Sequence, residues 1–152
     1  MAEHLATVSW QRDGEVFTDN KYSRAHTWRF DGGATVAASA SPHIVRAPYS
    51  VASAVDPEEA FVASLSSCHM LFFLSFAAKA GYVVDRYEDE ARGTLAKDAD
   101  GRLAMTQVVM RPRIAFAGRQ PSAEELDQLH HQAHEQCFLA NSVKTLIAVE
   151  AR

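Results

Sequence analysis

Two cysteines, Cys68 and Cys137, are the side chains of this 152-residue sequence that could act as chemical reagents. Cys68 lies inside the apolar stretch DPEEAFVASLSSCHMLFFLSF, where its neighbours Ser66, Ser67 and His69 are polar. A buried cysteine usually serves as a small apolar side chain, so core filling is the simplest interpretation of Cys68. A helix that only fills a core avoids such polar neighbours, and this leaves a chemical role open.

Thiol redox chemistry is a second interpretation of the two cysteines. A cysteine that reduces peroxides reacts as the thiolate, which requires a nearby cation to lower its pKa. The peroxide converts this thiolate to a sulfenic acid, and a second cysteine condenses with the sulfenic acid to form a disulfide. Two cysteines on two packed helices fit this cycle, but their spacing in the sequence does not show that they meet.

A zinc site is the third interpretation. His130, His134 and Cys137 recur at i, i+4 and i+7, which places them on one face of a helix. Together with Cys68 they form a set of cysteine and histidine ligands of the kind that zinc usually takes. No Glu follows His130, so the helix motif of zinc proteases is absent. We expect that the protein holds no metal and no other cofactor.

The composition predicts a single domain over residues 1–152 and argues against several classes of partner. The formal net charge is −4 and no cluster of Lys and Arg stands out, so we expect neither nucleic acid nor a membrane as a partner. No secretory signal is visible, which favours a cytoplasmic location where thiols stay reduced. Two cysteines are also too few for a disulfide scaffold.

The apolar pattern and the turn signals predict an α+β fold. The expected order is three strands, a long helix, two strands, a second helix and a final strand. The long helix begins after the cap Asp56 and ends before Gly81, and the second helix runs from the cap Ser122 to about Leu139. Strands are expected in residues 4–11, on either side of Asp31-Gly32-Gly33, on either side of Asp100-Gly101 within 82–118, and in 145–151.

The long helix raises a packing problem. The stretch from Phe61 to Ala80 is long and apolar enough to cross a bilayer. Its polar residues and the acidic residues before it favour a central helix that is buried on most sides. One α+β chain of this length offers a sheet for a single face, so we expect a homodimer that covers the others. A monomer with one well-covered helix is the alternative.

The sequence resembles the osmotically inducible protein C / organic hydroperoxide resistance family. The strongest likeness is DPEEAFVASLSSCHMLFFL, in which Cys68 follows Glu58 by ten residues, and a second is CFLANS around Cys137. The segment YSRAHTWRFDGGATVAASASP is similar to the early part of the family that carries an arginine, here Arg24. The resemblance covers the order of elements along the whole chain.

This resemblance implies an intertwined α+β homodimer with antiparallel β-sheets, two long central helices and two active sites at the subunit interface. It implies that Cys68 is the peroxidatic thiolate and that Cys137 is the resolving cysteine that forms a disulfide with it. Arg24 would hold the thiolate and polarise the peroxide, and Glu58 would orient Arg24. The implied substrates are organic hydroperoxides, which are reduced to alcohols, and the implied reductant is a dithiol or a lipoylated protein.

Glu58 and Cys68 are too far apart to touch within one straight helix. Ten residues correspond to about 15 Å along the axis and to an angular offset of about 280°. A site that contains both needs a long Arg24 as a bridge, or a glutamate supplied by the partner subunit. Arg29 and Arg46 are alternatives to Arg24 as the cation of the site.

Two positions depart from the family pattern. His69 follows Cys68 where better-known members have an apolar residue, so we single it out as a candidate modulator of the thiol. Phe138 follows Cys137 where many members have a proline. Two functions remain as alternatives to a peroxidase: a non-catalytic protein that binds a hydrophobic ligand under the long helix, and the zinc-binding protein described above.

Overall fold

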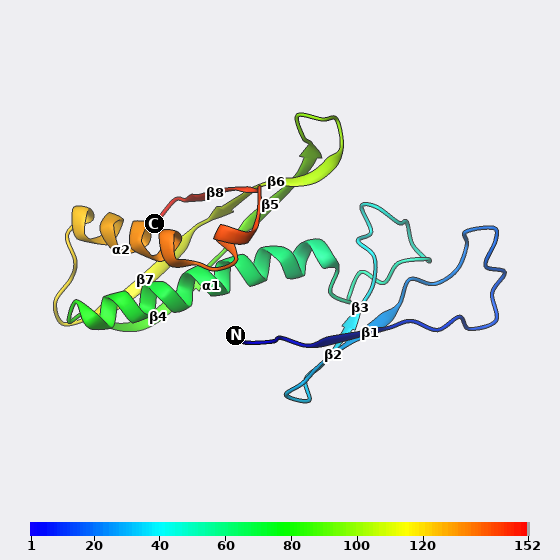
Figure 1. Cartoon of the computed structure of the whole chain (residues 1–152), viewed down its shortest axis with the longest axis horizontal. Helices are drawn as coiled ribbons and strands as arrows, with labels where there is room; N and C mark the ends of the chain where they lie inside the picture. The colour runs from blue at the N-terminus through cyan, green and yellow to red at the C-terminus, as the bar shows by residue number, and fades with distance from the viewer. Residues whose placement is uncertain (152) are drawn as a thin grey trace. The chain divides into compact units, whose positions relative to one another are not determined.

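The chain divides into two compact units in the computed structural model, which describes residues 1–151. The N-terminal unit is Met1–Ala60, and the C-terminal unit begins at Phe61. A single domain over residues 1–152 therefore stays a prediction. Figure 1 labels the helices and strands along the chain.

The order of elements is that of an α+β fold, as the sequence predicts. Residues 1–151 contain two helices and one 3-10 turn: α1 (Pro57–Lys79), α2 (Ala123–Gln136) and η1 (Ala140–Ser142). The strands are β1 (Ala6–Ser9), β2 (His26–Phe30), β3 (Thr35–Ala38), β4 (Val83–Asp89), β5 (Arg92–Lys97), β6 (Leu103–Met110), β7 (Pro112–Ala117) and β8 (Leu146–Val149).

The N-terminal unit is built on one antiparallel sheet in the order β1–β2–β3. Trp28 of β2 lies opposite Val8 of β1 and Val36 of β3. The predicted hairpin at Asp31-Gly32-Gly33 is confirmed, with Gly33 at φ 88°, a conformation that glycine adopts readily. The first strand is shorter than the predicted 4–11, because its pairing with β2 covers only four residues.

The ends of α1 follow the predicted local chemistry. The Asp56 carboxylate accepts a hydrogen bond from the Glu59 backbone N–H, and the Glu59 carboxylate accepts one from the Asp56 N–H. At the other end Gly81 has φ 81°, and the N–H groups of Gly81 and Tyr82 donate to the carbonyls of Ala78 and Ala77. This is a Schellman motif, in which glycine takes the left-handed position that ends a helix.

One stripe of α1 is fully buried within the C-terminal unit. It consists of residues at intervals of four: Leu65, His69, Phe73 and Ala77. Leu71 on another face is 63 % exposed, so the single chain leaves apolar surface of this helix open. The predicted long central helix is confirmed, and by length and composition it also satisfies the requirements for crossing a membrane, a test that core helices of soluble proteins pass.

Residues 82–118 form four strands, where the sequence predicts two. The strands β4 and β7 pair with each other, while β5 and β6 belong to a second sheet. The change of sheet occurs where Asp89 lies opposite Pro112, which has no N–H to donate to a ladder. The Asp89 carboxylate accepts the N–H of Arg111 there, so a side chain replaces the expected backbone partner.

The last strand pairs in parallel with β6, the one parallel pairing among the named strands of residues 1–151. This departs from the expected antiparallel sheets, because the chain returns to β6 through α2 and so approaches it in the same direction. The helix α2 begins at the predicted cap Ser122 and ends at Gln136, with Cys137 as its C-terminal cap. The predicted end near Leu139 is too late, since the backbone continues as η1.

Two apolar clusters form the core of the C-terminal unit. The larger cluster joins α1, α2, β4 and β7 and is centred on the fully buried Phe73 and Ala133. The smaller one joins α1 to the β5–β6–β8 sheet around Leu65, Val108 and Met110. The helix α1 is common to both clusters, so the residues at its middle are held from two sides (Figure 1).

Candidate thiol site

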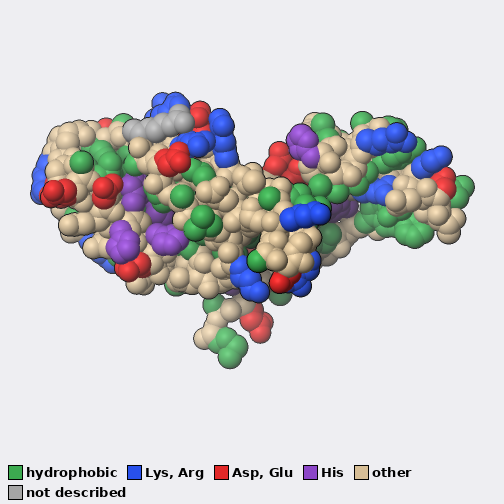
Figure 2. All heavy atoms as spheres, turned by 90° about the horizontal axis from the view of Figure 1, so that it is seen from above, with side chains coloured by type: hydrophobic (Ala, Val, Ile, Leu, Met, Phe, Trp, Pro, Cys, Tyr) green, Lys and Arg blue, Asp and Glu red, His purple; other side chains and the backbone are tan. Residues whose placement is uncertain are grey.

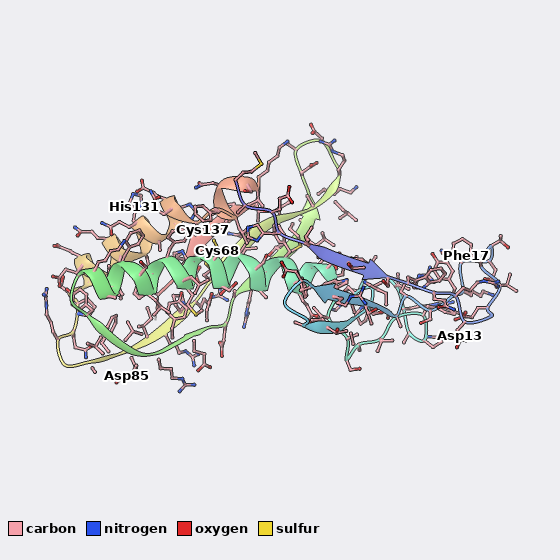
Figure 3. The ribbon with its side chains drawn as sticks, turned by 60° about the horizontal axis from the view of Figure 1, so that its bottom comes forward. Asp13, Phe17, Cys68, Asp85, His131 and Cys137 are labelled. Atoms are coloured by element: carbon pink, nitrogen blue, oxygen red, sulfur yellow. The ribbon has the colours of Figure 1, made fainter. Side chains whose placement is uncertain are left out.

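Cys68 and Cys137 meet between α1 and the end of α2. Their sulfur atoms lie 2.7 Å apart, and both residues are free thiols. Figure 3 shows the two side chains next to each other, one from each helix. The two residues are 69 positions apart in the sequence, so their contact depends on the packing of the two helices.

The two thiols differ in their surroundings. Cys137 is 1 % exposed, and Cys68 is half-buried. Burial raises the pKa of the Cys137 thiol to about 11, and its hydrogen bond to Cys68 raises it in the same direction. Cys137 is therefore protonated at neutral pH and donates its S–H to the Cys68 sulfur. Cys68 is the thiol that a dissolved reagent can reach.

Local structure fixes Cys137 at the end of α2. Its N–H donates to the carbonyl of His134, and its own carbonyl accepts the N–H of Asn141 at the start of η1. The Cys137 sulfur also accepts the N–H of Ala140. The backbone thus turns out of the helix at this residue and holds the sulfur on the side that faces α1.

An aromatic pair lies beside the thiols. Phe72 follows Cys68 by one helical turn, and Phe138 follows Cys137 directly. The two rings meet edge to face with centroids 5.1 Å apart, and Phe138 is 72 % exposed. An apolar surface therefore borders the reachable thiol.

A pair of histidines crosses the same helix interface. Nε2 of His69 and Nδ1 of His130 share a hydrogen bond of 3.0 Å, and both side chains are buried. Burial lowers the pKa of each imidazole to about 4, so both are neutral at pH 7. The sequence singles out both residues, but their contact could not be found from it, because 61 positions separate them.

The zinc hypothesis has no support from the geometry. Within residues 1–151, no group of three or more His, Cys, Asp or Glu side chains is arranged to hold a metal ion. Histidine side chains do gather on the surface of the C-terminal unit (Figure 2). The exposed His131 lies 3.3 Å from the Glu135 carboxylate. His130 is instead engaged with His69 inside the core.

Arg24 lies in the N-terminal unit, where it is bound by its own loop. Its guanidinium donates to the backbone carbonyls of Asn20 and Tyr22 and to the side-chain oxygen of Asn20. It also lies 3.8 Å from the centre of the Tyr22 ring. These contacts order the guanidinium, and its predicted contact with the thiolate stays a prediction.

Glu58 is half-buried in the first turn of α1. Within residues 1–151 it forms no ion pair, and Arg24 donates to Asn20 and Tyr22 rather than to it. The predicted role of Glu58 in orienting Arg24 stays a prediction. The two-subunit version of that prediction, in which the glutamate comes from the partner, stays open to test.

A surface pocket of about 360 Å³ lies at the C-terminal end of α1. Its lining combines apolar side chains such as Phe76 and Leu129 with Lys79, Arg119 and Glu125. This mixture of charges does not favour the hydrophobic ligand considered for the alternative function.

Two residues of β4 near the histidine pair were missed by sequence reasoning. Tyr87 is packed against Phe73, and its hydroxyl is buried without a hydrogen-bond partner among residues 1–151. Asp89 accepts a hydrogen bond from Ser66 of α1. Their i, i+2 spacing on one strand face was the available signal, because it places both side chains toward the same layer.

The family model for OsmC-like proteins matches residues 50–152. The chain belongs to the OsmC-like protein family. The match includes both cysteines of the site but not Arg24. None of the curated proteins compared with the chain matches it.

Solved structures of OsmC-like proteins share this fold. An OsmC-like protein of unknown function from Vibrio cholerae is 56 % identical over 100 % of both chains, with a TM-score of 0.98. An organic hydroperoxide resistance protein from Elizabethkingia anophelis is 17 % identical, with a TM-score of 0.71 over 99 % of this chain and 94 % of its own. OhrB of Bacillus subtilis, an organic hydroperoxide resistance protein, is 18 % identical, with a TM-score of 0.69 over 99 % and 98 %.

Proposed function

We propose that this protein is a cysteine-based peroxidase that reduces organic hydroperoxides to alcohols. The observation that carries the proposal is the 2.7 Å contact between the sulfurs of Cys68 and Cys137. Two thiols at this distance need little movement to form a disulfide, whose sulfurs are about 2.05 Å apart. Membership of the OsmC-like family and the names of the two hydroperoxide resistance proteins of like fold support the same function.

The first step is an attack of the Cys68 thiolate on the terminal oxygen of the hydroperoxide. The O–O bond breaks, the new S–O bond gives a sulfenic acid, and the leaving alkoxide takes a proton to become an alcohol. The half-buried position of Cys68 admits the peroxide, and the S–H of Cys137 stabilises the thiolate by donating to it. The aromatic pair Phe72–Phe138 offers a surface for the organic part of the substrate.

The second step joins the two sulfurs. Cys137 attacks the Cys68 sulfur, the S–OH bond breaks, and the leaving hydroxide takes the Cys137 proton to form water. Because the Cys137 thiol has a raised pKa of about 11, it remains a thiol until this step and does not compete for the peroxide. A dithiol or a lipoylated protein then reduces the disulfide by two thiol–disulfide exchanges, which oxidise the dithiol.

The test follows the consumption of tert-butyl hydroperoxide with dithiothreitol as the reductant. Cys68→Ser should reduce the rate to that of the uncatalysed reaction. Cys137→Ser should still form a sulfenic acid, which dimedone traps, but it should lose the intramolecular disulfide. Ser67→Ala, a change at an exposed neighbour on α1, is the control and should keep the full rate. An unchanged rate in Cys68→Ser would rule out the proposed chemistry.

Arg24 is proposed as the cation that stabilises the thiolate and the leaving oxygen. Arg24→Ala should lower kcat/KM on the order of a hundredfold, the usual cost of losing a donor to a developing oxyanion. Arg29→Ala removes a neighbouring cation and is the matched control. If Arg29→Ala causes the larger loss, the cation has been misassigned.

Glu58 is proposed to orient that arginine from a second subunit. Glu58→Gln should reduce turnover, while Glu59→Gln, which can keep its helix-capping hydrogen bond, should not. Mixing the impaired Glu58→Gln protein with inactive Cys68→Ser protein should raise turnover above the sum of the two separate proteins if one subunit supplies the glutamate to the other's thiol. No recovery in mixed dimers would contradict a shared site.

A homodimer is part of the same proposal. Several large apolar side chains are more than half exposed in the single chain: Leu5, Val8, Val16, Phe17, Ile44, Leu71 and Phe138. A second copy would cover such surface, which soluble monomers seldom leave contiguous. Sedimentation of the wild-type protein should give the mass of two chains, and a mass of one chain contradicts the homodimer. A cytoplasmic location, where dithiols are available, completes the proposal.

A further inference from the structure

Two polar contacts join α1 to α2 in the middle of the C-terminal unit. One is the thiol pair, and the other is the histidine pair, His69 and His130. On α1 the cysteine and the histidine are adjacent, so their side chains leave the helix about 100° apart. On α2 His130 precedes Cys137 by seven residues, which is two turns, or about 10 Å along the axis.

The spacing of these two contacts determines how well they restrict movement of α2 against α1. A single contact between two helices allows each to slide or rotate about that point. Two contacts about two turns apart on α2 remove both movements. Apolar packing along the same interface, such as that of Leu129 and Ala133, tolerates small shifts better than a hydrogen bond does, because a hydrogen bond weakens steeply with distance and angle.

The histidine pair is well defined and fully enclosed. His69 is 1 % exposed and His130 is 5 % exposed. Their rings are parallel within 10°, with centroids 5.3 Å apart, and the Phe73 ring stacks on His130 with centroids 4.5 Å apart. The shared hydrogen bond therefore joins two rings whose orientation is already restricted by packing.

Burying this pair brings little net stability. Within residues 1–151, Nδ1 of His69 and Nε2 of His130 have no hydrogen-bond partner. Each such buried polar atom costs about 1–3 kcal/mol, which is comparable to or larger than the gain from the one bond they share. Two apolar side chains at these two positions would stabilise the fold equally well. What the histidines add is a directional contact that specifies one arrangement of the helices.

We propose that the histidine pair positions α2 against α1 and so keeps Cys68 and Cys137 in contact. His69 and His130 are positioning residues in this scheme, and neither takes part in the redox chemistry itself. The inference rests on the proposed function, because a thiol pair that cycles through a disulfide needs its sulfurs held together. The experiment that tests this inference uses no peroxide. The positioning role and the peroxidase function can therefore fail independently.

The bond requires at least one neutral imidazole, since one ring must accept while the other donates. Burial lowers both pKa values to about 4, and the other imidazole and His134 lower that of His69 further. Asp89 of β4 acts in the opposite direction on His69. The remaining titratable groups that face this interface are Tyr87 of β4 and the two thiols.

The test measures how tightly the protein holds its disulfide. Full-length protein is equilibrated at pH 7 with mixtures of reduced and oxidised dithiothreitol, and free thiols are counted by alkylation and mass spectrometry. In this exchange the protein dithiol gives two electrons and two protons to the dithiothreitol disulfide. The equilibrium constant reports how well the fold holds the two sulfurs together.

The decisive variants either remove the histidine bond or keep it without imidazole. H69L/H130L removes it, and we expect the equilibrium constant for disulfide formation to fall at least about tenfold, equivalent to a reduction potential about 30 mV less negative. H69Q/H130N replaces Nε2 and Nδ1 by amide groups at similar positions, and we expect its constant to stay within about threefold of wild type. A merely structural role would not give this rescue.

The opposite results overturn the inference. If H69L/H130L unfolds cooperatively and keeps the wild-type constant, the bond does not position the thiols. A tenfold loss in both double variants equally contradicts it. Should the leucine pair not fold, His69→Gln and His69→Leu give the same comparison, because glutamine keeps a donor near Nε2 and leucine does not. Equal constants for these two variants would then refute the proposal. A normal constant without peroxide turnover would refute only the proposed function.

Discussion

The two units of this chain differ sharply in how they bury apolar surface. In the N-terminal unit Ala38 is the fully buried apolar residue, and the other buried side chains are polar: Ser39, Ser41, Ser50 and Asp56. The C-terminal unit buries large side chains such as Leu65, Phe73 and Met110 in two clusters. Sixty residues with so small a core have little to stabilise them. The large buried apolar side chains are thus in the C-terminal unit.

The largest expected effect compares a buried side chain of the C-terminal unit with an exposed one of the N-terminal unit. Phe73→Ala removes a fully buried ring from the C-terminal unit and should lower the free energy of unfolding by about 3–5 kcal/mol. Val8→Ala, at a side chain that is 65 % exposed in the N-terminal unit, should cost less than about 0.5 kcal/mol in a monomer. Urea unfolding measures both. A larger cost for Val8→Ala that depends on protein concentration would indicate that a second copy covers this strand.

Acid should destabilise the C-terminal unit through the histidine pair. Both imidazoles have a pKa near 4 in the folded chain, below their ordinary 6.5, so the unfolded state takes up protons first as the pH falls. The part of the free energy of unfolding that comes from burying uncharged imidazoles is fully present above pH 6.5. It is lost as the pH falls toward 4, by at most about 3 kcal/mol for one histidine. Urea unfolding at pH 7 and pH 5 checks this. H69Q/H130N should lose less free energy of unfolding between pH 7 and pH 5. An equal loss would contradict the assignment of the acid effect to the histidine pair.

A glycine in each unit tests how closely the elements pack. A Cβ at Gly93 of β5 would lie 2.4 Å from Cε of Met105 and 2.5 Å from Cγ2 of Val62. Gly93→Ala should therefore cost about 1–3 kcal/mol, because the Met105 and Val62 side chains must shift to admit the methyl group. Gly32→Ala in the N-terminal unit meets nothing within 4 Å and should be nearly neutral. Thermal unfolding ranks the two, and the reverse order would contradict the close approach of α1 to β5.

The smallest effect concerns the helix caps, one in each unit. Asp56 and Ser122 both close a reciprocal hydrogen-bonded cap, so their replacement by alanine should cost about 1 kcal/mol each. Asp56 is only 6 % exposed, and its loss should be the larger of the two, because the Glu59 N–H then loses its partner at a part-buried position. Denaturant midpoints of the two variants measure the difference. Equal costs would mean that burial adds nothing to the cap.

Features set by neighbouring residues could be predicted from the sequence. The caps at Asp56 and Ser122, the stop at Gly81 and the α+β order all follow from chemistry within a few residues, and all are confirmed. The division of 82–118 into four strands could not be predicted, since it depends on Asp89 meeting Arg111 across the hairpin.

The candidate site also has features that the sequence predicts and features that it does not. The types and spacing of its residues are enough to single out Cys68, Cys137 and His69 in the sequence. The contact between the thiols and the pairing of His69 with His130 are results of helix packing, so no pattern in the sequence could establish them. The roles proposed for Arg24 and Glu58 would need a second subunit, which the sequence of one chain cannot position.

The position of Cys137 at the joint between α2 and η1 has a mechanical consequence. Its backbone has φ −67° and ψ 109°, which is extended rather than helical, so it belongs to neither rigid element. Closing the gap from 2.7 Å to a covalent bond requires the sulfurs to approach by about 0.6 Å. A residue at such a joint can supply this movement by small backbone rotations while both helices keep their hydrogen bonds. Formation of the proposed disulfide would therefore not require either helix to unwind.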